Sequence, residues 1–282
     1  MMNRDYLINK IISLAIEEDV ESGDITTNAL VPDSTQAVAE LTAKADGVVS
    51  GLEIAKLVFE KFDDHIKWTP LVNEGDHVSK GDKIARVEGS YRALLTGERT
   101  ALNILQRMSG IATATSLYVK ELAGTKTQLL DTRKTAPGMR ILDKMAVKAG
   151  GGTNHRMGLY DMALIKDNHI KIAGGITNAV AQVRESAFPG MKIEVEVTNL
   201  DETREAIEAG ADIIMLDNMS TAQMAEAVRL INNRAATEAS GNMSISRLSE
   251  VASTGVDFIS VGALTHTVTA LDISMNIVPN GK

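Results

Sequence analysis

Apolar residues recur at helical spacing in three stretches of the first part of the chain, at 7–16, 52–62 and 91–121. Between them, residues 37–51 alternate like a strand, and residues 66–90 form short strands separated by glycine turns. The third helical stretch is interrupted near Ser109 and Gly110, so the pattern predicts two helices there. The chain up to about residue 112 is therefore expected to form a small domain of mixed helices and strands.

From about residue 127 onward, apolar strand-like runs alternate with helical stretches. The predicted strands cover residues 128–131, 162–166, 192–197, 212–217, 234–240 and 257–262. The predicted helices cover residues 139–150, 176–187, 201–210, 220–233, 244–255 and 268–277. Residues 210–218 and 254–262 also share one pattern, in which a glycine is followed by a predicted strand. Repeated units of this length predict a parallel sheet, and the repetition favours an α/β barrel over an open sheet.

Polar residues gather where these predicted strands end. They are Arg133, Lys134, Lys166, Glu194, Glu196, Asp217, Ser240, Gly241 and Gly262. In a barrel the carboxyl ends of the strands form the catalytic mouth. Any one of these residues can be a loop cap, but six strands with the same arrangement predict an active site.

Formal charge is unevenly distributed along the chain. Residues 131–171 contain eight Lys and Arg against four Asp, a balance of +4, whereas the whole chain carries -8. A local basic cluster on an acidic protein favours a small, highly anionic ligand over a nucleic acid, which needs a broad basic face. Lys144 and Lys148, four residues apart, instead fit the outer face of a helix or a subunit contact, as does Arg140.

Composition excludes several kinds of chemistry. The chain has no cysteine, so disulfides, thiolate catalysis and cysteine-bound metal sites are ruled out. The apolar run near the amino terminus is interrupted by Ser13 and followed by acidic residues, which fits neither a secretory signal nor a membrane span. We expect a cytoplasmic protein with no membrane and no nucleic-acid partner.

The candidate site residues suit two anionic ligands. Arg133, Arg156 and Arg99 offer planar donors for carboxylates or phosphates, and Lys134 and Lys166 add point charges. Carboxylates at Glu196 and Asp217 can bind Mg²⁺ through water or stabilise a developing cation. The turns Ser240-Gly241-Asn242 and Val261-Gly262-Ala263 suit a phosphate bound by backbone N–H groups. The residues thus predict an enzyme that binds a phosphorylated sugar and a polyanion, with Mg²⁺, but do not name its reaction.

Two other functional classes fit parts of the pattern. The hairpin-rich residues 66–90 resemble half of a biotinyl or lipoyl carrier domain, but Lys80 and Lys44 are not at the tight hairpin tip that a carrier lysine needs. Glu196 and Asp217 are compatible with a glycosidase carboxylate pair. The surrounding arginines and lysines argue against a neutral sugar.

Seven ordered motifs resemble those of the quinolinate phosphoribosyltransferase family, also called nicotinate-nucleotide pyrophosphorylase (carboxylating). They are DTRKTAPGMR, GGGTNHRMGLYD, LIKDNHI, EVEV, IIMLDN, EASGN and ISVGALTH. SGDITT and GERTALNILQRMSGIAT extend the resemblance over nearly the full length. Thr153 and Asn242 differ from the residues that are more common at these positions in the family, histidine and glycine, respectively.

The resemblance implies transfer of phosphoribosyl from phosphoribosyl pyrophosphate to quinolinate, with decarboxylation, for NAD synthesis. It also implies the type II phosphoribosyltransferase fold, an N-terminal mixed α/β sandwich domain plus an incomplete TIM-like α/β barrel. On this basis we expect the sandwich at residues 1–112, joined by segment 268–282, and the barrel at residues 113–267. A related transferase, such as the molybdenum-transport-associated homologues, is the alternative.

The resemblance also assigns roles to residues. Thr132, Arg133, His155 and Arg156 are expected to hold quinolinate, with Lys134 and Lys166 at carboxylate or pyrophosphate. Glu196 and Asp217 are expected at the ribose and its Mg²⁺, and the two glycine turns at the 5′-phosphate. Lys134, Lys166, Glu196 and Asp217 form the expected catalytic set. A homodimer or higher even oligomer is implied, in which Arg99 enters the partner's site.

Overall fold

A computed structural model describes residues 4–278, which divide into two units. The first unit takes the residues up to Ser116, Thr135–Gly151 and the stretch from Leu264 onward. The second takes Leu117–Lys134 and Gly152–Ala263. Within the described part of the chain, none of the helices has the length and apolar character needed to cross a membrane.

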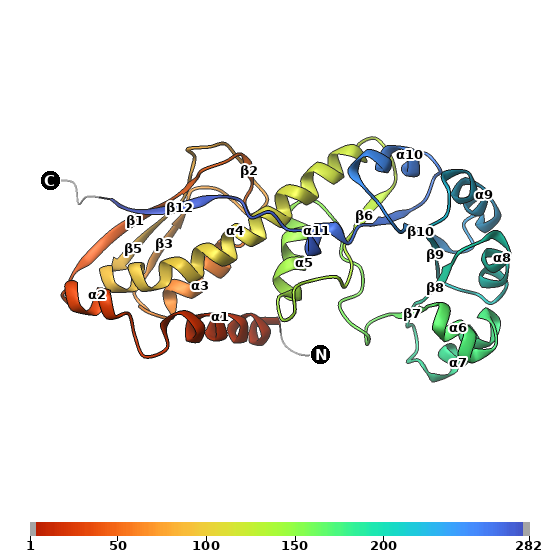
Figure 1. The fold of residues 1–282 in the computed structure, drawn as a ribbon, viewed down its shortest axis with the longest axis horizontal. Coiled ribbons are helices and arrows are strands. Elements are labelled where there is room, and N and C mark those ends of the chain that lie inside the picture. Colours follow the sequence, from red (N-terminus) through yellow and green to blue (C-terminus); the bar gives the residue numbers. More distant parts are fainter. Residues whose placement is uncertain (1–3, 279–282) are drawn as a thin grey trace. The chain divides into compact units, whose positions relative to one another are not determined.

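An antiparallel four-stranded sheet organises the first unit (Figure 1). Its strands lie in the order β12 (Ile273–Val278), β1 (Gln36–Ala43), β5 (Lys83–Ser90) and β3 (Lys67–Pro70). β2 (Gly47–Val48) and β4 (His77–Val78) form a separate pair. The helices are α1 (Arg4–Val20), α2 (Ile25–Leu30), α3 (Leu52–Glu60), the first part of α4 (Tyr91–Glu121), α5 (Arg140–Ala149) and α11 (Ala263–His266), whose first residue belongs to the second unit. The expected mixed α/β domain is confirmed.

The end of the described chain is a strand, so the helix predicted over residues 268–277 is wrong. β12 runs antiparallel to β1, with Met275 opposite Leu41. Ile273 and Met275 are buried while Ser274 between them is partly exposed, which is the two-residue period of a strand with one buried face. Pairing with β1 thus decides the structure of this segment.

The predicted break near Ser109 and Gly110 is also wrong, because α4 continues through both residues. A Cβ added to Gly110 would lie 2.1 Å from the backbone oxygen of Thr269. Gly110 therefore serves close packing of another backbone segment against the helix, rather than ending it.

Helix α5 carries two charged side chains that are buried, Asp143 and Lys144. The sequence predicted Lys144 on the outer face of this helix. Lys144 is only 1% exposed, so that interpretation is wrong, whereas Lys148 is exposed as expected. The neighbouring Asp143 is fully buried and accepts two hydrogen bonds of 2.9 Å from the guanidinium of Arg107. α5 thus presents charge to the interior of the first unit.

The second unit is built on a six-stranded, wholly parallel sheet (Figure 1). Its strands lie in the order β6 (Gln128–Leu130), β11 (Phe258–Ser260), β10 (Ala236–Ser240), β9 (Ile213–Asp217), β8 (Ile193–Val197) and β7 (Ala163–Ile165). The connecting helices are α6 (Asp167–Ala173), α7 (Ile176–Ser186), α8 (Leu200–Glu208), α9 (Thr221–Ile231) and α10 (Leu248–Ala252), the last preceded by the 3₁₀ turn η1 (Ile245–Arg247). With β6 and β7 as its edges, the sheet matches the expected incomplete α/β barrel. The helix α6 was not predicted.

Candidate active site

The carboxyl ends of the parallel strands lie at one edge of the sheet and carry the predicted polar residues. Asp217 ends β9 and is in register with Ser240, which ends β10. Lys166 directly follows β7, and Glu196 lies one residue before the end of β8. Strand pairing therefore places these four residues on neighbouring strands at the same edge.

Two arginines come from the loops nearest β6, the outermost strand on one side of the sheet. Thr132, Arg133 and Lys134 follow β6, and the N–H of Lys134 donates to Thr132 Oγ1 (3.1 Å), which makes a tight turn. The pKa of Arg156 is lowered by burial and by the positive charge of Arg133, against the opposing effects of Glu194 and Asp161. The Leu130–Thr153 bridge and the bond from the His155 N–H to Asp131 join the segments that carry the two arginines, and a doubly charged anion would suit two guanidiniums there.

The loop that carries Arg156 is fixed by two aspartates. The N–H of His155 donates to Asp131 Oδ1 (2.9 Å) at the end of β6. The carboxylate of Asp161 accepts from the N–H groups of Met157 (2.6 Å) and Gly158 (2.8 Å). The guanidinium of Arg156 itself donates to the backbone oxygen of Met162 (3.1 Å). These bonds hold a segment that has no helix or strand of its own.

Thr153 and Asn242, which differ from the residues more common in the family, have local structural roles. Thr153 forms a parallel bridge with Leu130, and its hydroxyl donates to Gln128 Oε1 (3.3 Å). Asn242 adopts a left-handed conformation (φ 50°), and its side-chain amide donates to Asn218 Oδ1 (3.1 Å). Asn242 thus supports the turn after β10, whereas the Thr153 side chain bonds to the first residue of β6.

Lys166 and Glu196 form the shortest charged pair at this edge. Lys166 Nζ donates to Glu196 Oε2 at 2.7 Å. The N–H of Lys166 also donates to His169 Nδ1 (3.0 Å), so His169 caps α6 and closes the loop. On the next strand Asp217 Oδ2 accepts from the Asn218 amide (2.8 Å). Glu196 and Asp217 supply the carboxylate oxygens that Mg²⁺ prefers.

The first predicted phosphate turn requires its glycine. Gly241 has φ 92°, and a Cβ added there would lie 2.3 Å from Asn218 Oδ1. The turn after β10 thus packs against the turn after β9. In the second turn, the N–H of Val261 donates to Leu130 O (2.9 Å), which leaves Gly262 and Ala263 beyond the end of β11.

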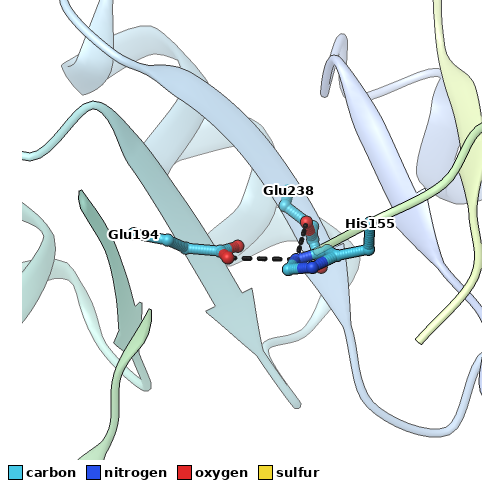
Figure 2. A group of neighbouring side chains, drawn as sticks. All are labelled: His155, Glu194 and Glu238. Carbon is cyan, nitrogen blue, oxygen red and sulfur yellow. Dashed lines mark ion pairs between the residues drawn. The ribbon is translucent and has the colours of Figure 1, made fainter. Parts of the chain in front are cut away.

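Three titratable side chains that converge below this edge form the His–Glu–Glu cluster, His155, Glu194 and Glu238 (Figure 2). His155 Nε2 lies 3.0 Å from Glu194 Oε2 and 3.3 Å from Glu238 Oε2. The side chains are 7%, 0% and 1% exposed, respectively. The glutamates come from β8 and β10, two strands separated by β9. The cluster is therefore anchored in the sheet.

Burial and mutual contact shift the pKa values of two members of the cluster. Burial opposes charging of the imidazole, but bonding to Glu194 and Glu238 outweighs it and raises the pKa of His155 to about 10. Burial, reinforced by Glu238 and opposed by His155, raises the pKa of Glu194 to about 7. The N–H of Arg156 donates to His155 Nδ1 (2.7 Å), which favours a ring proton on Nε2 alone. The shifts of His155 and Glu194 belong to one cluster whose members titrate together, because the imidazole lies against both carboxylates.

Sequence reasoning missed Glu238 and gave Glu194 no role. Both sit two residues before a predicted edge residue, Glu196 or Ser240, on the same face of the strand. A glutamate within an otherwise small and apolar strand was the available signal. The predicted Arg99 lies exposed on α4 in the first unit, so its place at a partner's site stays a prediction.

Comparisons with known proteins identify the family of this chain. Residues 24–109 match the N-terminal domain and residues 111–276 the C-terminal domain of "Quinolinate phosphoribosyl transferase". The chain is 44% identical to the chloroplastic nicotinate-nucleotide pyrophosphorylase [carboxylating] of Arabidopsis thaliana, covering 96% of this chain and 83% of that protein. It is 42% identical to the probable enzyme of that name from Bacillus subtilis, covering 96% and 93%.

A solved structure extends the similarity to three dimensions. The nicotinate-nucleotide pyrophosphorylase from Francisella tularensis superposes with a TM-score of 0.93 at 41% identity, covering 99% of this chain and 98% of that one. Both domain matches and the similarity of the whole fold thus point to the same family. The chain belongs to the quinolinate phosphoribosyltransferase family.

Proposed function

We propose that this protein transfers the phosphoribosyl group of phosphoribosyl pyrophosphate to the ring nitrogen of quinolinate. The reaction releases pyrophosphate and carbon dioxide and gives nicotinate mononucleotide for NAD synthesis. The observation that carries the proposal is that the segments carrying Arg133 and Arg156 are joined at the end of β6 by the Leu130–Thr153 bridge and the bond from the His155 N–H to Asp131. Two adjacent guanidiniums match the two adjacent carboxylates of quinolinate, each of which can accept a bidentate pair of hydrogen bonds.

The charged groups divide between the two substrates. Arg133 and Arg156, with the turn at Thr132, hold the diacid. Lys134 and Lys166 neutralise carboxylate or pyrophosphate, and Lys166 is already directed at the sheet edge by its 2.7 Å bond to Glu196. The turns at Ser240-Gly241-Asn242 and Val261-Gly262-Ala263 supply backbone N–H groups to the 5′-phosphate.

The carboxylates of Glu196 and Asp217 suit the first chemical step. Departure of pyrophosphate leaves a ribose with oxocarbenium character, and fixed negative charge beside it stabilises that transition state. Lysine charge stabilises the leaving group at the same time. The quinolinate nitrogen then completes the new bond to the ribose.

Decarboxylation needs little from the protein. Once ribosylated, the ring nitrogen is cationic, and the ring can hold the electron pair that the departing carboxylate leaves behind until that carbon takes up a proton from water. The arginines orient the carboxylate and a water-poor surrounding weakens its hydration, so the protein contributes positioning and desolvation.

Mg²⁺ is part of the proposal. Glu196 and Asp217 are the residues that would hold it, directly or through water, because both offer carboxylate oxygens on adjacent strands. When bound, Mg²⁺ neutralises the pyrophosphate charge. We expect chelation with EDTA to abolish turnover and added Mg²⁺ to restore it.

A homodimer or higher even oligomer and cytoplasmic residence belong to the proposal as well. The exposure of Arg99 on α4 leaves its side chain accessible to another subunit. Cell fractionation and light scattering test these two points separately from activity.

A turnover assay tests the reaction itself. Purified protein with Mg²⁺ and phosphoribosyl pyrophosphate should form nicotinate mononucleotide from quinolinate, with one carbon dioxide released per product. Nicotinate, which lacks the second carboxylate, should be used at least about tenfold less efficiently because one arginine stays unpaired. Preference for nicotinate, or no turnover of either compound, would overturn the assignment and favour a related transferase with another substrate.

A further inference from the structure

Asn218 lies between the carboxylate of Asp217 and the first phosphate turn, Ser240-Gly241-Asn242. Its Nδ2 donates to Asp217 Oδ2 at 2.8 Å, and its Oδ1 accepts from Asn242 Nδ2 at 3.1 Å. Its backbone N–H donates to Ser240 O at 3.0 Å, which ties the end of β9 to the end of β10. One side chain thus links the last residue of β9 to the turn that follows β10.

The carboxylate of Asp217 decides how both amides are turned. An ionised carboxylate only accepts hydrogen bonds, so Asn218 must present its NH₂ group to Asp217. The oxygen of the Asn218 amide then faces Asn242, and only the NH₂ group of Asn242 can pair with an oxygen. The direction of the two bonds therefore follows from chemistry as well as from the distances.

The backbone around Asn218 and Asn242 holds both side chains in place. Both residues are left-handed, with φ 53° and 50°, a conformation that asparagine tolerates better than most residues. A Cβ added to Gly241 would lie 2.3 Å from Asn218 Oδ1, so the amide packs directly on the Gly241 backbone. Arg247 Nη1 donates to Asn242 O at 3.3 Å, which fixes the main chain of the turn.

A simpler interpretation is that position 242 needs asparagine only for its left-handed backbone. Asn233, just beyond the end of α9, has such a backbone (φ 59°), and its side chain makes no hydrogen bond with any described residue. The side chain of Asn242, by contrast, donates to Asn218. The two asparagines thus share a conformation and differ in what their amides contact, which makes Asn233 a matched control.

We propose that Asn242, Asn218 and Asp217 form an amide bridge, in which the two asparagines position the Asp217 carboxylate against the turn that receives the 5′-phosphate. Asn242 acts through Asn218, and Asn218 acts on Asp217. The bridge serves the half of the site that takes phosphoribosyl pyrophosphate, because it joins the carboxylate at the ribose to the turn at the phosphate. The identity of that substrate rests on the proposed function.

Kinetics of glycine variants test the amide bridge. Asn242→Gly keeps the left-handed backbone and removes the amide. The KM for phosphoribosyl pyrophosphate should rise about three- to tenfold, as for the loss of one or two hydrogen bonds, while the KM for quinolinate stays within about twofold. Asn233→Gly makes the same substitution at a similar φ and should leave both KM values at those of wild type.

A double variant tests whether Asn242 acts through Asn218. Asn218→Gly also keeps the left-handed backbone, and it removes the centre of the amide bridge. Adding Asn242→Gly to this variant should change the KM for phosphoribosyl pyrophosphate no further. Independent roles of the two asparagines would instead multiply their separate effects.

NMR tests the amide bridge in ligand-free protein, without reference to activity. In ¹⁵N-asparagine-labelled protein, the side-chain NH₂ signals of Asn218 and Asn242 are assigned by their loss in the two glycine variants. The Asn218 signal should shift in Asn242→Gly and keep its position in Asn233→Gly.

The inference is overturned by an unchanged KM for phosphoribosyl pyrophosphate in Asn242→Gly, or by equal rises in both KM values. Multiplied effects in the double variant, or an Asn218 signal that does not respond to Asn242→Gly, would overturn it as well. A wild-type enzyme inactive on quinolinate would instead contradict the proposed function, and the NMR signals of the ligand-free protein would still test the amide bridge.

Discussion

In the proposed function, Arg133 and Arg156 set the affinity for the diacid through a few charge-assisted hydrogen bonds. Arg133 comes from the turn after β6, whereas the phosphate turns belong to β10 and β11. On the proposed assignment, the two substrates rely on different residues at the carboxyl ends of the strands. This separation allows a single side chain to be tested against each ligand in turn.

Replacement of Arg133 by alanine should weaken quinolinate binding by about 2–3 kcal/mol, roughly 30- to 150-fold, because a charged bidentate partner is lost. Binding of phosphoribosyl pyrophosphate should change by less than about threefold. Calorimetric titration with each ligand measures both effects, and Arg229→Ala, an exposed arginine on α9, serves as control. Equal losses for the two ligands would show that this division of roles is wrong.

The same residues show what sequence alone can and cannot reveal about the site. Arg133, Lys166 and Asp217 were predictable because each ends or follows an apolar strand, and parallel strands bring their ends together. The partnership of His155 with Glu238 was not, because it joins residues far apart in the chain through the sheet interior. Lys144 was misplaced for a similar reason: helical spacing identifies a face but not what covers it.

At the scale of elements, long periodic helices such as α1, α8 and α9 were predicted correctly because their burial follows from their own sequence. α4 and β12 were not, since each depends on a partner segment. Gly110 weakens a helix in isolation, yet here it admits the backbone near Thr269. β12 has an ambiguous pattern until β1 supplies its hydrogen bonds.

Gly110→Ala should therefore destabilise the first unit, although alanine is the better helix former. The new methyl group would collide with the Thr269 carbonyl, and overpacking of this kind costs about 1–3 kcal/mol. Urea denaturation should show a lower midpoint than wild type. Asn103→Ala, at an exposed position of the same helix, should leave the midpoint unchanged or raise it slightly. A midpoint for Gly110→Ala at or above that of wild type would mean that the close approach is absent in solution.

At the scale of the whole molecule, a shared active site makes a quantitative prediction. If Arg99 serves the neighbouring subunit, the single variants Arg99→Ala and Lys166→Ala should each be inactive. After mixing, dissociation and reassociation, half of the dimers are mixed and each has one intact site, so about a quarter of wild-type activity should return.

Each variant taken alone through the same cycle provides the control for that experiment. Absence of recovery, with mixed dimers demonstrated by mass spectrometry of differently tagged chains, would place Arg99 and Lys166 in the same subunit's site or outside any site.

The pairing of β12 with β1 has a consequence for synthesis on the ribosome. The first unit cannot complete its sheet until residues 273–278 have emerged, because β12 pairs along β1, which begins at Gln36. The second unit needs no residue beyond Ala263. All strands of the parallel sheet are therefore synthesised before the antiparallel sheet can be completed. Until then β1 has a free edge that invites pairing with other chains, so a nascent chain stalled before residue 273 should depend most on chaperones.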